Sequence, residues 1–95
     1  MSTDAPEKAQ VVNGSVLREG APMEGAYVRV LGPSGEFVNE RRTGPEGTFK
    51  LHLTPATWTF IAFGPGTPRV ERAVTVEAGA DQEISFDLGG RPTDG

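Results

Sequence analysis

The side chains best suited to catalysis are scarce in this 95-residue chain, which has one histidine, one tyrosine and no cysteine. The single histidine, His52, stands between Leu51 and Leu53 in a run that alternates apolar and polar residues. A general base needs an orienting partner, and a metal site needs further ligands. Because Lys50, two residues earlier, marks a polar row of the same run, we interpret His52 as an exposed strand residue.

The other residue types form no catalytic, cofactor-binding or metal-binding pattern. Serine and threonine nucleophiles have no base to activate them, and without cysteine there is no thiol nucleophile, disulfide or zinc–thiolate site. The glutamates do not follow the calcium-loop spacing, although two carboxylates could still meet across strands as in a glycosidase. The glycine-rich segments 44–47 and 64–66 lack the lysine and helix of a phosphate loop. We therefore predict no enzyme activity, no cofactor and no metal.

Four residues are candidates for a contact surface: Tyr27, Arg29, Phe37 and Phe63. Tyr27 and Arg29 share one face of an alternating run, while Phe37 and Phe63 stand beside loops. Exposed aromatic residues mark surfaces that bind a partner or a ligand. For Tyr27 the alternative is that its ring packs on its own sheet.

Short apolar runs, separated by turns that use many of the 13 glycines and 8 prolines, must position these residues. None of the runs has sustained helical periodicity, and their lengths are typical of strands. We expect about seven strands, at residues 11–18, 26–31, 37–43, 48–53, 58–63, 69–76 and 82–88. Such a series predicts an all-β sandwich or a small barrel. The charges of 37–43 suit an edge strand, which could pair with a second copy.

The inward positions of these strands define a predicted core, and two glycines have predicted structural roles. Gly14 leaves room for close packing or a bulge, and Gly47 supplies a positive φ before a strand. Leu53 continues the apolar row of its strand. The predicted core comprises Val12, Val16, Ala26, Val28, Val30, Phe49, Leu51, Trp58, Phe60, Val74, Val76, Ile84, Phe86 and Leu88.

Charge and hydropathy exclude several partners. The net charge of −4 argues against nucleic acid, and no apolar run reaches the length of about 20 residues that a membrane span needs. The first residues do not form a signal peptide, and the lack of cysteine favours a cytoplasmic location. We expect one domain at 10–88 between disordered tails at 1–9 and 89–95.

Segments 12–16, 20–30, 43–51 and 58–62 together resemble the carboxypeptidase regulatory-like domain. The resemblance implies a prealbumin-like (transthyretin-like, Ig-like) antiparallel β-sandwich and is silent on chemistry. Two enzyme families have related folds. Hydroxyisourate hydrolases use several histidines and a C-terminal Tyr-Arg-Gly-Ser tail. Intradiol dioxygenases bind iron with two tyrosines and two histidines. Tyr27 and His52 alone supply neither set.

Segments 25–31, 35–38, 47–49 and 57–59 more closely resemble a small SseC-like actinobacterial family of unknown function. Genes of that family often lie beside thiosulfate sulfurtransferases, which implies a link to sulfur metabolism by association. We therefore expect a protein-interaction or accessory module with a sulfurtransferase as partner. The alternative is a module that binds a small ligand or carbohydrate through exposed aromatic residues.

Overall fold

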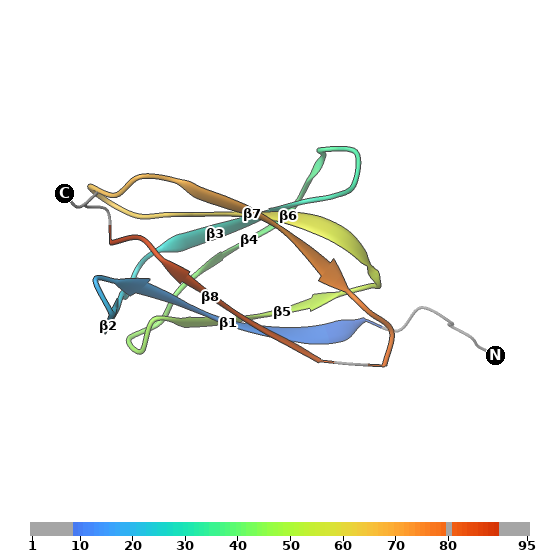
Figure 1. Ribbon diagram of the computed structural model, residues 1–95, viewed down its shortest axis with the longest axis horizontal. Helices are drawn as coiled ribbons and strands as arrows, with labels where there is room; N and C mark the ends of the chain where they lie inside the picture. Colours follow the sequence, from blue (N-terminus) through green and yellow to red (C-terminus); the bar gives the residue numbers. More distant parts are fainter. Residues whose placement is uncertain (1–8, 80, 90–95) are drawn as a thin grey trace.

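Two β-sheets pack face to face in the computed structural model, which describes residues 9–79 and 81–89 (Figure 1). In the first sheet, β1 (Gln10–Arg18) is central. It pairs antiparallel with β5 (Thr48–Leu53) and with the short β2 (Ala21–Pro22). On its other side it pairs with β8 (Gln82–Asp87), and this pair is parallel.

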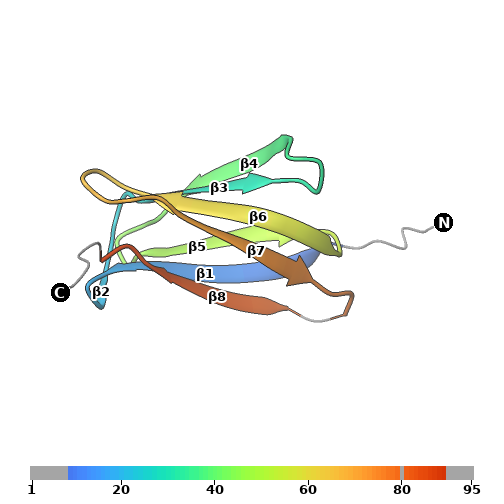
Figure 2. The ribbon, with the colours of Figure 1, turned by 45° about the horizontal axis from the view of Figure 1, so that its top comes forward.

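The second sheet is wholly antiparallel, in the order β4 (Phe37–Arg42), β3 (Tyr27–Leu31), β6 (Ala56–Phe63) and β7 (Val70–Val76). Figure 2 shows β4 at one margin of this sheet and β7 at the other. The predicted edge position of β4 is therefore confirmed, and the apolar strand β6 lies inside the sheet between β3 and β7.

The predicted all-β sandwich is confirmed, with two corrections. The described residues form eight strands, because Ala21–Pro22, which we expected to be a turn, pairs with the end of β1. The sandwich is also not antiparallel throughout, because β8 runs parallel to β1. Alternation of apolar and polar residues determines which face of a strand is buried, but it carries no information about the direction of the neighbouring strand. The predicted tails fall almost entirely outside the described residues.

The core lies between the sheets where the alternation placed it. Twelve of the fourteen predicted core residues are buried; Trp58 and Ile84 are partly buried and pack against the others. Leu53 and Ala62 complete the cluster. Ile61 is also buried, although it lies on the outer face of β6 opposite Arg29 of β3.

Both glycine predictions hold. A Cβ on Gly14 would overlap the ring of Phe49, its partner on β5. Because neither pairing of β1 at this position shifts in register, close packing is the correct alternative and a bulge is not. Gly47 has a φ of 72°, and a Cβ there would lie 2.8 Å from both Met23 N and Val16 O.

The chain crosses between the sheets twice in this region, from β2 to β3 and from β4 to β5. Thr43 links these two connections. It is the one buried polar residue among those described. Its Oγ1 donates to Met23 O (2.6 Å) and accepts from Ala26 N (2.9 Å). Its backbone N–H donates to Ala26 O (2.8 Å), and its carbonyl accepts from Gly25 N (3.0 Å). These four bonds attach the segment before β3 to the segment after β4.

No helix in the described part of the chain is long and apolar enough to cross a membrane.

We expect Thr43→Val to lower the free energy of unfolding by about 1–3 kcal/mol, because the valine leaves Ala26 N–H and Met23 C=O without their hydroxyl partner. Thr43→Ser keeps the hydroxyl and is the control, with a loss of about 1 kcal/mol or less for one buried methyl. Urea titration followed by tryptophan fluorescence measures both variants. Equal losses in the two would show that the hydroxyl bonds do not stabilise the crossing.

Candidate functional site

The outer face of the second sheet brings three of the four predicted contact residues together. Tyr27 of β3 lies directly opposite Arg42 of β4 and Phe63 of β6. Arg29 stands two residues further along β3, which places it on the same face. Phe37, the fourth candidate, is opposite Leu31 at the far end of β3 and β4. All four candidates therefore lie on one sheet face, with Phe37 apart from the other three.

Two aromatic rings and two guanidinium groups form a continuous stack on this face. The rings of Tyr27 and Phe63 are 5.6 Å apart between centroids and 23° from parallel. The Arg29 guanidinium lies 5.5 Å from the Phe63 centroid, and the Arg42 guanidinium lies 5.8 Å from the Tyr27 centroid. We call Arg29, Phe63, Tyr27 and Arg42 the cation–aromatic stack. A guanidinium group over an aromatic ring is attracted by the electrons of the ring.

The donors of Arg29 are poorly satisfied within the described residues. Arg29 Nη2 is 3.7 Å from Glu40 Oε2, which is an ion pair too long to be a hydrogen bond. Arg29 Nε is buried and has no hydrogen-bond partner in the described structure. Sequence patterning had identified Arg29 as part of the surface, but it gave no sign of this missing partner.

Exposed apolar side chains extend the surface toward the other end of β4. Phe37 is 61% exposed, Val38 is 40% exposed and Tyr27 is 37% exposed. The pairing of β3 with β4 shifts register between Val30 and Leu31, so that Asn39 faces Val30 while Phe37 faces Leu31. The residue between them, Val38, occupies the bulge. Sequence reasoning missed Val38, because a bulge interrupts the alternation from which exposure is predicted.

The free edge of β4 is partly closed by its own side chain. Asn39 Oδ1 accepts a hydrogen bond from the backbone N–H of Glu40 at 2.7 Å. That N–H is therefore not available to another strand, and the neighbouring bulge further breaks the regular edge. The sequence suggested that this edge could pair with a second copy, and the geometry argues against it.

The β8 edge is covered in a comparable way. Arg72 of β7 donates from Nη1 to Ser85 O at 3.0 Å, and its guanidinium lies 4.8 Å from the Phe86 ring centroid. Arg72 therefore spans the two sheets at the side where β7 and β8 run, and it occupies a carbonyl of the edge strand. This arginine stabilises the fold and does not belong to the cation–aromatic stack.

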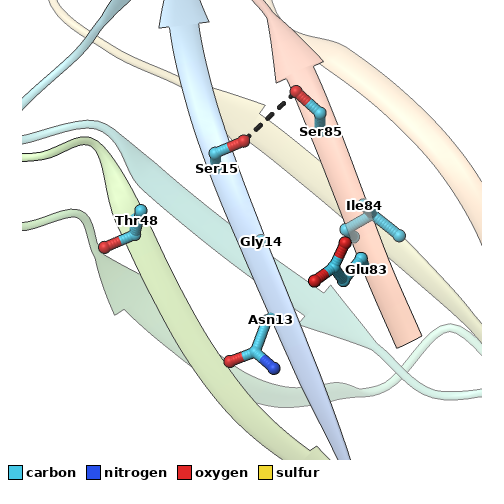
Figure 3. Close-up of a pocket in the computed structure, with 7 residues that line it drawn as sticks. All are labelled: Asn13, Gly14, Ser15, Thr48, Glu83, Ile84 and Ser85. Carbon is cyan, nitrogen blue, oxygen red and sulfur yellow. Dashed lines mark hydrogen bonds between the residues drawn. The ribbon is translucent and has the colours of Figure 1, made fainter. Parts of the chain in front are cut away.

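A shallow hollow of about 390 Å³ lies on the outer face of the first sheet, where β5, β1 and β8 run side by side (Figure 3). Small side chains create it: the Ser15 hydroxyl donates to the Ser85 hydroxyl at 3.2 Å, and Thr48 stands beside Ser15. Asn13 and Glu83 border it. The hollow contains none of the predicted contact residues and no aromatic ring.

His52 is exposed, as predicted, and pairs with Val11 on the outer face of the first sheet. Tyr27 projects from the outer face of the second sheet, so the two residues point away from opposite sides of the sandwich. They cannot meet at one reaction centre. Within residues 9–79 and 81–89, no three histidine, aspartate or glutamate side chains form a group that could hold a metal ion.

We expect Asn39→Ala to promote self-association, because it frees the Glu40 N–H at the edge of β4. Sedimentation velocity over a concentration series should show a dimer with this variant at concentrations where the parent is monomeric. Asn13→Ala is the matched control, since Asn13 lies on β1, which is paired on both sides. Identical sedimentation of Asn39→Ala and the parent would mean that the bulge alone protects the edge.

Solved structures with similar folds come from unrelated contexts. The Bacillus anthracis TIE protein superposes with a TM-score of 0.73 at 14% identity, over 83% of this chain and 17% of that chain. The dioxygenase domain of a dioxygenase carbohydrate-binding protein fusion from Streptomyces sp. SirexAA-E has a TM-score of 0.72 at 14% identity, over 96% and 86%. At these identities the similarity concerns the fold alone.

Sequence comparison leads to proteins without an assigned activity. An uncharacterized protein of Mycolicibacterium smegmatis is 39% identical over 57 residues, which are 59% of this chain and 63% of that protein. The match therefore spans less than two thirds of the relative's length. The family described as "Protein of unknown function (DUF1416)" matches residues 1–88. That description includes neither the carboxypeptidase regulatory-like nor the SseC-like name, so both resemblances stay predictions. The chain belongs to this family of unknown function.

Proposed function

We propose that this protein is a non-catalytic interaction module that binds a partner protein on the outer face of β4, β3 and β6. The observation that supports this most directly is the cation–aromatic stack, with the exposed side chains of Phe37 and Val38 at the far end of the same strands. Aromatic residues and arginine are enriched at the centres of protein interfaces. An exposed apolar surface of this kind is a common mark of a binding site.

The stack would lower the free-energy cost of ordering side chains on binding, because it limits their motion before the partner arrives. Each guanidinium group already rests on a ring, and each ring rests on the other. Ordering a long side chain during association costs roughly 0.5–1.5 kcal/mol. A pre-ordered Arg42 avoids part of this cost.

A thiosulfate sulfurtransferase is the partner that we propose, in the cytoplasm. The support is the resemblance of segments 25–31 and 35–38 to the SseC-like family. Genes of that family often lie beside the genes of thiosulfate sulfurtransferases. Because this chain has no cysteine, the persulfide chemistry would belong entirely to the enzyme. The module would then position or stabilise the enzyme and would not carry sulfur.

A ligand-binding module is the second candidate, and the exposure of Phe37 favours it. A ring that is 61% exposed offers a face for stacking of a sugar or another planar ligand. The polar hollow of the first sheet does not add to this, since it lies on the opposite side of the sandwich. Binding of a glycan that Phe37→Ala abolishes and Arg42→Glu leaves intact would favour this candidate.

Calorimetric titration of the protein with a thiosulfate sulfurtransferase from the same organism tests the proposed function. We expect saturable binding that Arg42→Glu weakens at least tenfold, since the change reverses a charge within the stack. Lys50→Glu is the matched control, because it makes the same charge change on the outer face of the first sheet. It should change the dissociation constant less than twofold.

An absence of binding to the sulfurtransferase would remove that enzyme as the partner. Equal effects of Arg42→Glu and Lys50→Glu would show that net charge, and not this face, governs the association. In that case the second sheet would lose its role as the binding surface.

A further inference from the structure

We infer that the partner presents carboxylate side chains, next to apolar residues, to Arg29 and Arg42, and that it lies across the sheet face without adding a strand to β4. The inference rests on the proposed function and specifies the chemistry of the partner. Three observations support it: the guanidinium groups and their unmet donor, the distribution of charge, and the state of the β4 edge.

The two guanidinium groups lie over aromatic rings, with the central carbon of Arg29 5.5 Å from the Phe63 centroid and that of Arg42 5.8 Å from the Tyr27 centroid. The hydrogen-bonding groups of arginine lie in its plane and form a fork that matches a carboxylate with two parallel bonds. Contact with a ring supplies a cation–π attraction but no charge-assisted hydrogen bond, so the bonds to a carboxylate are still to be made.

Arg29 in particular lacks an acceptor. Its Nε–H is buried without a partner among the described residues, and Glu40 approaches only Nη2, at 3.7 Å. Glu40 balances the charge of Arg29 without accepting a hydrogen bond from it. An incoming carboxylate that accepts from Arg29, after a rotation of this side chain, would satisfy a donor that the free protein leaves unmet.

Local charge has the opposite sign to the whole chain. The protein carries a net charge of −4, yet β3 and β4 together contain three arginines, Arg29, Arg41 and Arg42, and one acid, Glu40. Arg41 points to the other side of its strand, opposite Val28, and adds positive charge at the margin. Glu71 of β7 lies on the same sheet face opposite Ile61, on the far side of β6. The part of the face formed by β3 and β4 is therefore the part that is complementary to an acidic surface, and the exposed Phe37 and Val38 at the far end of these strands provide the apolar part of the contact.

The edge of β4 determines how the partner approaches. Addition of a strand needs free backbone N–H and C=O groups in regular alternation. Here Asn39 Oδ1 already accepts from Glu40 N, and the bulge at Val38 interrupts the alternation. The side chains on the face remain accessible, so the contact is made through side chains.

The experiment uses the ¹⁵N-labelled protein and a blocked peptide, acetyl-Glu-Phe-Glu-Phe-Glu-amide, followed by NMR. We expect saturable shifts of the side-chain Nε–Hε signals of Arg29 and Arg42 and of backbone signals in β3 and β4. The peptide with glutamine in place of glutamate should bind at least fivefold more weakly. Arg29→Lys and Arg42→Lys each keep the charge and lose the fork, and each should weaken binding at least threefold.

Arg18→Lys is the matched control, because Arg18 is an exposed arginine at the end of β1 in the first sheet; it should change the affinity less than twofold. Equal binding of the glutamine peptide would overturn the inference that carboxylates are recognised. Shifts confined to backbone amides of β4, without arginine side-chain shifts, would show strand addition and overturn the face-on mode. Arginine-dependent binding to phosphatidylglycerol vesicles, with no binding of the peptide, would assign the face to lipid and overturn the inference.

The two proposals fail separately. If the sulfurtransferase binds with the expected dependence on Arg42 and the glutamate peptide does not bind, the carboxylate inference is wrong and the proposed function stands. If the peptide binds as expected and the sulfurtransferase does not, the enzyme is wrong as the partner and the chemistry of the face stands.

Discussion

The hydrogen bonds of Thr43 hold together the two places where the chain passes between the sheets. The oxygen of its side chain contacts the segment before β3, and its backbone pairs with Ala26. A second set of bonds lies next to it: Val16 N donates to Gly47 O at 2.7 Å, and Met23 N donates to Val16 O at 2.9 Å. A sandwich whose sheets touch only through apolar side chains has little to determine their relative position, since hydrophobic contacts are not directional. Hydrogen bonds are directional, so this corner determines how β3 and β4 stand over β1.

The candidate site begins at that corner. Tyr27 directly follows Ala26 in the chain, and Arg42 directly precedes Thr43. Tyr27 and Arg42 are paired with one another on β3 and β4. The cation–aromatic stack is therefore built from the first rung of the sheet after the anchored pair, and Phe63 of β6 extends it by one strand. Side chains on a sheet keep their spacing because neighbouring strands keep theirs. This position gives the stack a rigid base, whereas Phe37 and Val38 lie at the far end of the same strands, beside a bulge.

Much of this arrangement follows from the sequence, and the parts that do not have identifiable causes. Period-two alternation predicted the buried rows of β1, β3, β5 and β8, and the glycine at position 47 predicted a positive φ, because both depend on local chemistry. It also placed Tyr27, Arg29 and Phe63 on an outward face. It could not predict that β8 runs parallel to β1, that Thr43 is buried at a crossing, or that Asn39 caps the edge of β4. Each of these depends on contacts between segments that are far apart in the sequence. A threonine before Gly-Pro, or an asparagine in a polar strand, is common in loops and strands, so neither residue type indicates such a contact.

A negatively charged protein that recognises acidic side chains must rely on short-range contacts. At physiological ionic strength the net charge of −4 is screened beyond about 8 Å, so it neither attracts nor strongly repels a partner from a distance. Close to the surface, only the groups nearest the contact matter, and on β3 and β4 the outward-facing Arg29 and Arg42 outnumber Glu40. The rest of the chain has a negative net charge, to which Glu71 on the same sheet face contributes. This uneven distribution of charge over the surface therefore favours one orientation of the complex. It does less for the rate of association, because the complementary charges act only after the two proteins are in contact.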